Sequence, residues 1–371
     1  MEAEPAVNIK DDFEYLISFL PQNWREMAIQ TRAVKRFRSF GDAVVLLRVM
    51  MMHLAEGFSL KETSVWAKLS GVANVSSVAI MERLRQSPEW FRQLSLGVMS
   101  RWFVGAPGPL LKETRLVRFV DATRVKEKGP SGTTWNMHYS LCLNTLRCDE
   151  FHVTDRRGGE TLKRFNIKNG DIIVGDRAYG VRPGIVHVIR HGGDVIVRIN
   201  LTNLPLLDKD GALFGLLKRL RELKGVAIGD WDVDFLYEHQ RFHGRVCAAR
   251  KSPQAIRRAK ARVLRRGQKN GEAVSRETIE ASEFIMVFTT LPREKYKAEV
   301  VLEIYRGRWQ IELVFKRLKS LMEFGHLPKV DERSVLGWIQ GKLLIAFLIE
   351  ALTAKGEVFF PWGYPLPITS Q

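Results

Sequence analysis

The stretch RLVRFVDATRV, residues 115–125, marks the point at which the pattern of the chain changes from helix to sheet. Before it, from Asp12 to about Val104, apolar residues recur at helical spacing and few runs resemble strands. After it come runs rich in Val, Ile, Phe and Tyr, which are typical of strands. The sequence therefore predicts a helical N-terminal domain followed by a domain built on a β-sheet.

Seven elements are expected in the first part of the sheet domain, in the order β-β-β-α-β-α-β. Its helical stretches lie near Glu160 to Phe165 and Gly184 to His191. The expected strands are Arg115 to Val125, Trp135 to Leu143, Glu150 to Thr154, Asp171 to Gly175 and Asp194 to Asn200. This order is compatible with a ribonuclease-H-like mixed α/β core.

The sheet domain is interrupted before it is complete. Between Leu201 and Ser282 the pattern is less regular, with strand-like pieces at Asp230 to Tyr237 and Arg245 to Ala249. We interpret this region as an insertion subdomain. Phe284 to Thr289 then restores a core strand, and the sequence predicts one long helix from Glu294 to about Met322.

Composition narrows the function classes before any motif is considered. The 371 residues include 58 Lys and Arg against 41 Asp and Glu, a formal net charge of +17. Such an excess indicates a polyanionic partner, most commonly nucleic acid; a basic but otherwise ordinary enzyme is the alternative. Three scattered cysteines argue against a disulfide framework and against a Cys-rich zinc site.

The sequence gives no sign of export or of membrane insertion. The acidic N-terminus, MEAEPAVNIKDDFEYL, lacks the basic start and apolar run of a signal peptide. The most apolar stretches, around Val44 to Leu54 and Leu343 to Ile349, are broken or bounded by charged residues. They fall short of the ~20 residues that a membrane span needs. We therefore expect core helices at both places, a cytoplasmic location and no membrane partner.

The helical N-terminal region contains a candidate helix-turn-helix. The capping-box pattern of residues 59–62 predicts the start of one helix, residues 70–74 predict a turn, and Ser76 predicts the start of a second helix. Such pairs also occur in plain helical bundles. Because the second helix offers only Arg83 and Arg85 as basic contacts, the DNA-binding and the bundle interpretations both stay open.

A strongly basic segment lies inside the insertion. It runs from Lys251 to Lys269 and holds no acidic residue. Its eight basic residues are Lys251, Arg257, Arg258, Lys260, Arg262, Arg265, Arg266 and Lys269. In a helix these charges would surround much of the cylinder, which suits contact with a phosphate backbone better than packing. The alternative is a solvated loop or a frayed helix.

Two aspartates stand in similar strand contexts. Asp121 follows the run Arg118-Phe119-Val120, and Asp176 follows Ile172 to Gly175. A strand that ends in Asp fixes the position of the carboxylate, while the edge of the sheet leaves it open to a metal ion. Aspartate also commonly caps or turns the chain after a strand, so either residue alone is compatible with a structural role.

A third acidic residue lies on the predicted long helix, within YRGRWQIELVFKRLK at residues 305–319. At 3.6 residues per turn, Glu312 shares one face with a tyrosine and three cations. These neighbours are Tyr305, Arg308, Lys316 and Lys319. One carboxylate among such groups suits metal binding beside phosphates. The alternative is an exposed amphipathic face held by ion pairs between residues four apart.

Together these motifs resemble those of a known family. The spacing Tyr-x2-Arg-x3-Glu-x6-Lys within residues 305–319 resembles the signature of bacterial cut-and-paste transposases of the DDE type, the family named after insertion sequence four. The motifs VDAT at residues 120–123 and GDRAYG at residues 175–180 resemble that family's two aspartate motifs. Their order, and an insertion between the second aspartate and the glutamate, are also similar.

The resemblance implies a ribonuclease-H-like catalytic domain in which Asp121, Asp176 and Glu312 bind two divalent cations. The expected ion is Mg²⁺, with Mn²⁺ as a substitute. Cleavage of a phosphodiester needs a deprotonated water or 3′-hydroxyl and relief of charge on the leaving oxygen, and paired metal ions supply both. Because the cations themselves keep the carboxylates ionised, this chemistry requires no buried acid with a raised pKa.

The same resemblance implies which groups contact DNA. Tyr305, Arg308 and Lys319 are expected on the phosphates of the transposon end, and Lys316 joins them from its place on the helix face. Arg308 is the strongest of these candidates because its planar guanidinium can bind a phosphate through two hydrogen bonds.

The sequence therefore predicts a transposase that binds the inverted-repeat ends of its own insertion sequence, cleaves them and transfers their 3′ ends to target DNA. Double-stranded DNA is the expected partner, a dimer in a synaptic complex the expected assembly, and the bacterial nucleoid the expected location. The alternatives are a ribonuclease-H-like nuclease without strand transfer and a catalytically silent DNA-binding protein.

The predicted organisation has four parts, with the segment GAPGP at residues 105–109 as a linker after the first. They are a helical DNA-binding domain at residues 1–104, a catalytic domain at 110–200 and 283–330, an insertion subdomain at 201–282, and a C-terminal helical segment and tail at 331–371.

Overall fold

The computed structural model describes residues 10–102, 115–127, 134–321, 323, 326–327 and 331–357. The predicted linker at residues 105–109 and the tail after residue 357 lie outside these ranges. The chain divides into two compact units. We call them the helical unit, which comprises Met1–Ala106, Arg124–Trp135 and Phe315–Gln371, and the sheet unit, which comprises Pro107–Thr123 and Asn136–Val314.

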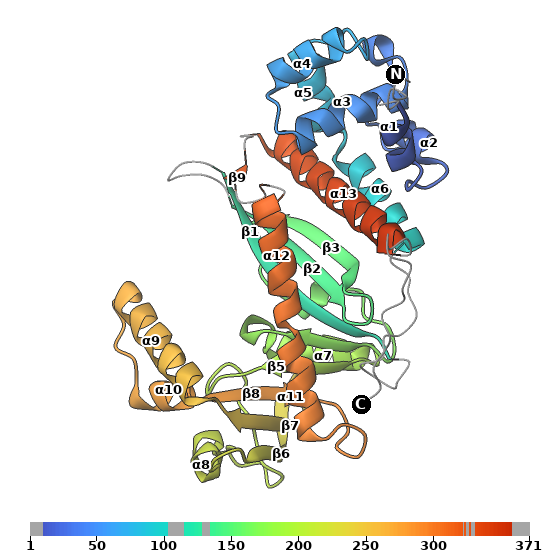
Figure 1. The fold of residues 1–371 in the computed structure, drawn as a ribbon. Coiled ribbons are helices and arrows are strands. Elements are labelled where there is room, and N and C mark those ends of the chain that lie inside the picture. The colour runs from blue at the N-terminus through green and yellow to red at the C-terminus, as the bar shows by residue number, and fades with distance from the viewer. Residues whose placement is uncertain are drawn as a thin grey trace, which may run out of the picture. The chain divides into compact units, whose positions relative to one another are not determined.

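The helical unit contains the helices that the N-terminal pattern predicted. Its described helices are α1 (Lys10–Ile17), α2 (Trp24–Gln30), the short 3₁₀ helix η1 (Arg38–Phe40), α3 (Ala43–Ala55), α4 (Leu60–Leu69), α5 (Ser77–Gln86), α6 (Pro88–Trp102) and α13 (Glu332–Glu357). Figure 1 labels the α-helices among them. α13 packs against α3, α5 and α6, so the two ends of the sequence share one helical core. The short strand β9 (His326–Leu327) pairs with the end of β1 (Val117–Glu127).

The length of α13 corrects one expectation. Residues 332–353 form a stretch that is long and apolar enough to cross a membrane by length and composition, although the run Leu343 to Ile349 alone is too short. However, 78% of an 18-residue segment within this stretch is buried. Because its apolar surface is covered by protein, α13 is a core helix, as the sequence predicted.

The candidate helix-turn-helix forms with the expected caps. Ser59 and Glu62 make the reciprocal capping box of α4, and the Ser76 hydroxyl accepts a hydrogen bond from the backbone of α5. The two basic residues of α5 are engaged within the chain. Arg83 donates to Gln86 and to the Ala33 carbonyl, and Arg85 binds Glu82 and Asp331.

One mixed sheet forms the second half of the fold, with the strand order β3-β2-β1-β4-β5-β8-β7-β6. β1 pairs in parallel with β4, and β4 with β5, whereas β8 runs antiparallel to both β5 and β7. The strands are β1 (Val117–Glu127), β2 (Thr134–Cys142), β3 (Arg147–Asp155), β4 (Ile172–Gly175), β5 (Asp194–Arg198), β6 (Ile228–Tyr237), β7 (Gln240–Arg250) and β8 (Phe284–Thr289). The predicted α/β fold class, a ribonuclease-H-like mixed sheet preceded by helices, is confirmed.

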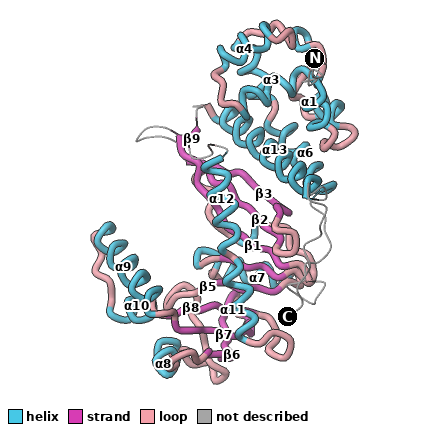
Figure 2. The backbone as a smooth tube through the Cα atoms, viewed as in Figure 1, coloured by secondary structure: helices cyan, strands magenta, loops and turns pink. Residues whose placement is uncertain are grey.

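The region predicted as an insertion contributes directly to this sheet. Its strands β6 and β7 form a hairpin, and β7 pairs with β8, as the adjacent magenta strands in Figure 2 show. Helices in and around this region are η2 (Leu162–Arg164), η3 (Arg177–Tyr179), α7 (Arg182–Arg190), α8 (Leu216–Glu222), α9 (Pro253–Asn270) and α10 (Arg276–Ala281). The basic segment is therefore mostly helical: α9 starts at the cap Ser252 and ends at Gly271, whose backbone is left-handed.

The two faces of the sheet pack against different helices. Val195 and Val197 of β5 belong to a large core that includes Ile185 and Val188 of α7. Because side chains alternate along a strand, Ile196 points to the opposite face. The helix α11 (Ala298–Gly307) contacts β5, β6, β7 and β8.

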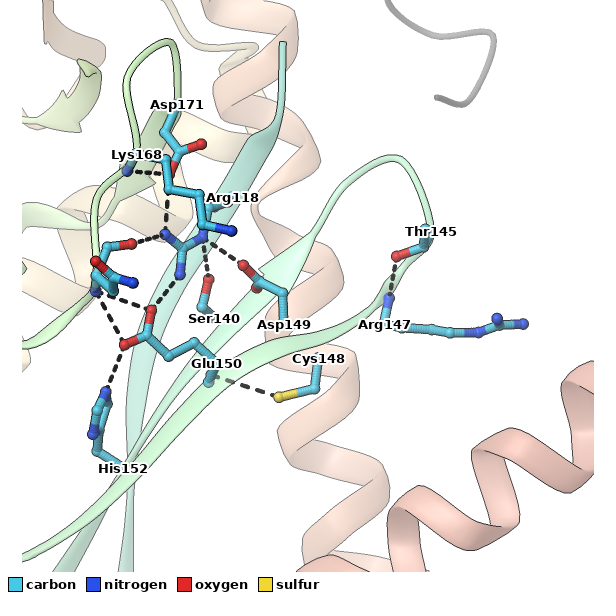
Figure 3. A network of polar contacts seen from close by, with 11 residues as sticks. Arg118, Ser140, Thr145, Arg147, Cys148, Asp149, Glu150, His152, Lys168 and Asp171 are labelled. Atoms are coloured by element: carbon cyan, nitrogen blue, oxygen red, sulfur yellow. Dashed lines mark hydrogen bonds and ion pairs between the residues drawn. The ribbon is translucent and has the colours of Figure 1, made fainter. Parts of the chain in front are cut away.

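A buried arginine joins the first strands of the sheet to the loop before β4 (Figure 3). Arg118 of β1 is 3% exposed and forms ion pairs with Asp149, Glu150 and Asp171, at 2.5, 2.5 and 3.2 Å. It also donates to the Ser140 hydroxyl. A buried charge is tolerated only when it is paired and hydrogen-bonded, and Arg118 meets this condition at every nitrogen. The arginine therefore ties β1, β2 and β3 to the entry of β4.

We expect Arg118→Met to reduce the free energy of unfolding by about 3–5 kcal/mol, because three carboxylates would be left without their buried partner. The control is Arg190→Met, which breaks the half-exposed pair with Glu238. That change should cost far less, since exposed ion pairs contribute little. Urea denaturation of both variants checks this, and equal losses would contradict a structural role for the Arg118 network.

Candidate active site

The register of β1 and β4 brings two of the predicted site residues together. In this parallel pair Val120 lies opposite Gly175, the last residue of β4. The next residues along the two strands are Asp121 and Asp176, so the two carboxylates leave the backbone at neighbouring points. β1 does not end at Asp121 but continues to Glu127, two residues beyond the predicted strand Arg115 to Val125. The open edge arises because β4 ends, and not because β1 does.

The second aspartate motif, GDRAYG, folds back on itself directly after β4. The Asp176 carboxylate caps η3 by accepting a hydrogen bond of 2.8 Å from the backbone N–H of Ala178. Gly175 allows this turn, because a Cβ at that position would lie 2.8 Å from the Cβ of Tyr179. One carboxylate oxygen of Asp176 therefore has a structural role, as the alternative interpretation of this residue suggested.

The third motif does not lie on one continuous helix as predicted. α11 ends at Gly307, and α12 (Trp309–Leu321) begins after Arg308. At the junction the backbone N–H groups of Arg308 and Ile311 donate to carbonyls three residues earlier, which tightens the turn locally. Gly307 lies against β1: a Cβ there would meet the Phe119 ring at 3.0 Å. This contact places the junction two residues from Asp121 along β1.

Arg308 at this junction connects two of the predicted acidic residues. Its guanidinium binds Asp121 at 3.1 Å through one terminal nitrogen and Glu312 at 2.5 Å through the other. The Arg308 and Asp121 side chains are each 15% exposed, whereas Glu312 is 59% exposed. The structure thus holds Asp121, Arg308 and Glu312 in one cluster, with Asp176 beside Asp121 through the strand register.

The electrostatics of the cluster favour positive charge. Burial, together with the negative charges of Asp176 and Glu160, raises the pKa of the Asp121 carboxyl to about 7. The metal chemistry expected from the sequence required no raised pKa; the shift arises first from burial and then from the neighbouring carboxylates. The Arg308 guanidinium acts in the opposite direction by stabilising the ionised form of Asp121.

A fourth acidic residue and a tyrosine belong to the same surroundings and were not singled out from the sequence. Glu160, an exposed residue after β3, acts electrostatically on both Asp121 and Tyr179. Tyr179 is fully buried, and its hydroxyl has no hydrogen-bond partner in the described part of the chain. Burial raises the pKa of this phenol, and the carboxylates of Asp121, Glu160 and Asp176 raise it further. The position of Tyr179 inside the GDRAYG motif could have drawn attention to this residue. No motif in the sequence marks Glu160.

The donor set suits a hard divalent cation. Asp121, Asp176, Glu312 and Glu160 offer carboxylate oxygens, the ligands that Mg²⁺ and Mn²⁺ prefer over nitrogen or sulfur. In the described residues no three acidic, His or Cys side chains converge on a single point. Arg308 stands between Asp121 and Glu312, and a positive charge is what these two carboxylates hold between them. The residues therefore fit metal binding by their chemistry, with Arg308 as the cation they share here.

The other side chains that were predicted to contact DNA differ in how far they are exposed to solvent. Tyr305 is only 8% exposed, and its ring centre lies 5.9 Å from the guanidinium carbon of Arg308. Lys316 and Lys319 are exposed on α12, in the stretch of that helix that belongs to the helical unit. Tyr305 therefore supports Arg308 directly.

The order of the motifs and the fold around them define a class of enzyme, and the family comparison agrees. The model of the transposase DDE domain matches residues 113–348. This chain belongs to that family and is a DDE transposase, an enzyme that catalyses DNA cleavage and strand transfer. Enzymes of this family use divalent metal ions. The predicted membership of the DDE transposases is thereby confirmed, while the roles of the individual signature residues stay predictions.

Particular relatives extend over nearly the whole chain. The putative transposase InsL for insertion sequence element IS186A of Escherichia coli (strain K12) is 33% identical over 347 residues, which is 92% of this chain and 93% of the relative. The transposase for insertion sequence element IS421 of Escherichia coli is 33% identical over 348 residues, with the same shares. The transposase for IS231F of Bacillus thuringiensis subsp. israelensis is 22% identical over 204 residues, 51% of this chain and 43% of the relative. These relationships fit the narrower family named in the sequence analysis.

The contact of Gly307 with β1 can be tested by filling it. Gly307→Val should destabilise the sheet unit by about 1–3 kcal/mol, because the new side chain overlaps Phe119. The second change Phe119→Leu in the same chain should recover part of the loss by making room. A double-mutant cycle of unfolding free energies measures the coupling. If the two losses simply add, the junction is not held against Phe119.

Proposed function

We propose that this transposase binds the inverted-repeat ends of its own insertion sequence, cleaves them with the help of two divalent metal ions, and transfers the 3′ ends to target DNA. The observation that carries the proposal is the gathering of Asp121, Asp176 and Glu312 around the edge where β4 ends, with Arg308 between two of them. Relatives of similar length are transposases of insertion sequence elements, which supports the choice of substrate.

The metal site of this proposal consists of Asp121, Asp176 and Glu312, with Mg²⁺ as the ion and Mn²⁺ as its substitute. When bound, the ions supply an activated water or 3′-hydroxyl and stabilise the leaving oxygen. The contribution of the chain is to hold the carboxylates. The strand pair fixes Asp121 and Asp176, whereas Glu312 extends from a helix that can approach them through an exposed side chain.

Arg308 has two tasks in this proposal. It neutralises the crowded carboxylates, and its partly buried guanidinium can bind a phosphate that approaches them. Tyr305 contributes because its ring packs against that guanidinium. Lys319, and more weakly Lys316, extend the phosphate contacts along α12, since both are exposed on the same helix.

The assembly and the helical domain are part of the same proposal. Joining two ends requires two active sites, so we place the chain in a synaptic dimer that acts on the nucleoid in the bacterial cytoplasm. Residues 1–104 are proposed as the DNA-binding domain, 110–200 with 283–330 as the catalytic domain, 201–282 as the insertion subdomain and 331–371 as the C-terminal segment. The capped helices α4 and α5 support the first assignment; because Arg83 and Arg85 are engaged within the chain, other side chains would have to meet the DNA.

Removing any one of the three carboxylates should reduce end cleavage by more than about 100-fold, because even residues that only orient metal ligands are worth 10–100-fold. The variants are Asp121→Ala, Asp176→Ala and Glu312→Ala, assayed with DNA carrying the terminal repeats and Mg²⁺. Glu303→Gln is a matched control, because Glu303 is exposed on α11 and pairs only with Arg306 among the described contacts. Cleavage at the wild-type rate by all three variants would remove the proposed site.

Arg308→Ala should weaken binding of the terminal repeats and make that binding less dependent on salt. Each phosphate contact that is lost lowers the slope of log K against log salt by about 0.9. Fluorescence anisotropy over a series of salt concentrations measures the slope. An unchanged slope would assign Arg308 to the internal ion pairs alone.

A further inference from the structure

A large cleft opens on the catalytic edge of the sheet unit. It has a volume of about 1020 Å³. Asp176 and Arg308 line one end of it, and α9 together with the start of α10 lines the other. All of its lining residues belong to the sheet unit. The basic helix of the insertion therefore forms a wall of the same cavity that the candidate active site opens into.

Only some of the basic residues of α9 line the cleft. Arg258, Arg262 and Arg266 line the cleft, and because they are four residues apart they share one face of the helix. All three are exposed, and none makes an ion pair with a carboxylate in the described part of the chain. Like charges four residues apart destabilise an isolated helix, so their alignment has no benefit for folding. It does suit an anionic ligand that lies along the helix.

The opposite wall is also cationic. Arg177, Arg198 and Arg308 face the cleft from η3, β5 and the α11–α12 junction. Lys251 also lines the cleft, where burial, together with the charges of Arg198 and Arg262, lowers the pKa of its ammonium group to about 8. Among the residues that the structure describes, only Asp176 and Glu272 bring negative charge to the lining. A polyanion in this cavity would meet cations on both sides.

No aromatic side chain belongs to the lining within the described ranges of the chain. Proteins that hold single strands by their bases usually stack those bases on aromatic rings. Apart from its charged groups, the cleft is lined by small and aliphatic side chains and by a few hydroxyl and amide groups. Contacts between arginine and phosphate position DNA without reading its sequence. The cleft is thus built to hold a sugar–phosphate backbone of any sequence.

Only part of the DNA that a transposase handles has a fixed sequence. The inverted repeat is constant, whereas the DNA on the other side of the cleaved bond differs from one insertion site to the next. The flank occupies that side before cleavage, and target DNA occupies it during strand transfer. The cleft leads away from the predicted catalytic carboxylates and offers no contacts that would distinguish bases. It therefore suits the DNA beyond the cleaved bond, whose sequence varies.

We propose that the cleft between α9 and the edge at Asp176 binds the backbone of DNA outside the element, both the donor flank and the target. This inference rests on the proposed cleavage function, because that function places the scissile phosphate at Asp176. Arg258, Arg262 and Arg266 are then binding residues for DNA without sequence preference. Apart from Arg308, which lies at the end of the cleft next to the scissile phosphate, the groups that bind the inverted repeat lie outside the cleft.

The test compares two triple variants of equal charge. The cleft variant carries Arg258→Gln, Arg262→Gln and Arg266→Gln. The control carries Arg257→Gln, Arg265→Gln and Lys269→Gln, which removes the same charge from exposed positions of α9 that do not line the cleft. Circular dichroism and thermal melting confirm that both variants are folded. Neither variant alters the three carboxylates.

The first measurement is binding of repeat DNA with and without a flank of arbitrary sequence, by anisotropy at several salt concentrations. We expect the cleft variant to lose most of the affinity that the flank adds, with the salt slope reduced by about 2–3, and to bind the repeat without a flank like the wild type. The control should resemble the wild type on both DNAs. An equal loss on both DNAs would place the repeat in the cleft and overturn the proposal, and so would a loss that is the same in the two variants.

The second measurement separates the two sources of variable DNA. Pre-cleaved repeat ends carry no flank, so their joining to a plasmid depends on target binding alone. We expect the cleft variant to join them at least about 10-fold more slowly than the control, and to cleave flanked ends more slowly as well. Normal joining by the cleft variant would exclude the target and overturn that half of the proposal. Because flank binding is measured without chemistry, its outcome is independent of whether Asp121, Asp176 and Glu312 prove to be catalytic.

Discussion

The parallel pairing of β1 with β4, in which Val120 lies opposite Gly175, is the constraint on which the site depends. A shift by one residue would turn Asp121 to the other face of the sheet, because side chains alternate along a strand. Arg118 protects this register. Its ion pairs join β1 to β3 and to Asp171 at the entry of β4, so the same strand carries both the anchor and the carboxylate.

The third side of the site depends on a break in a helix. Gly307 lets the end of α11 approach Phe119, and the tightened turn that follows directs Arg308 towards Asp121. At this turn Arg308 connects Glu312, four residues further along the chain, with Asp121 of the central strand.

Charge is distributed unevenly over the sheet unit, and this distribution connects the insertion with the chemistry. The carboxylates gather where β4 ends, and the cations of α9 face them across the cleft. The net charge of +17 alone says only that an anion is attracted. Because the cations form two walls of a cavity, an anion is attracted into that cavity in particular. Some arginines of α9 line this cleft, and others face only solvent.

The sequence by itself determined the fold class and the order of most elements, and it singled out Asp121, Asp176 and Glu312 as the predicted metal-binding residues. Strand and helix periods are local properties, and the motifs around Asp121, Asp176 and Glu312 are contiguous. Tertiary structure alone decided that the predicted long helix breaks at Arg308, and that Glu160 and Tyr179 lie beside Asp121. It also decided which arginines of α9 line the cleft. These features arise from contacts between segments far apart in the chain, such as Gly307 with Phe119, and no local pattern of residues encodes such contacts.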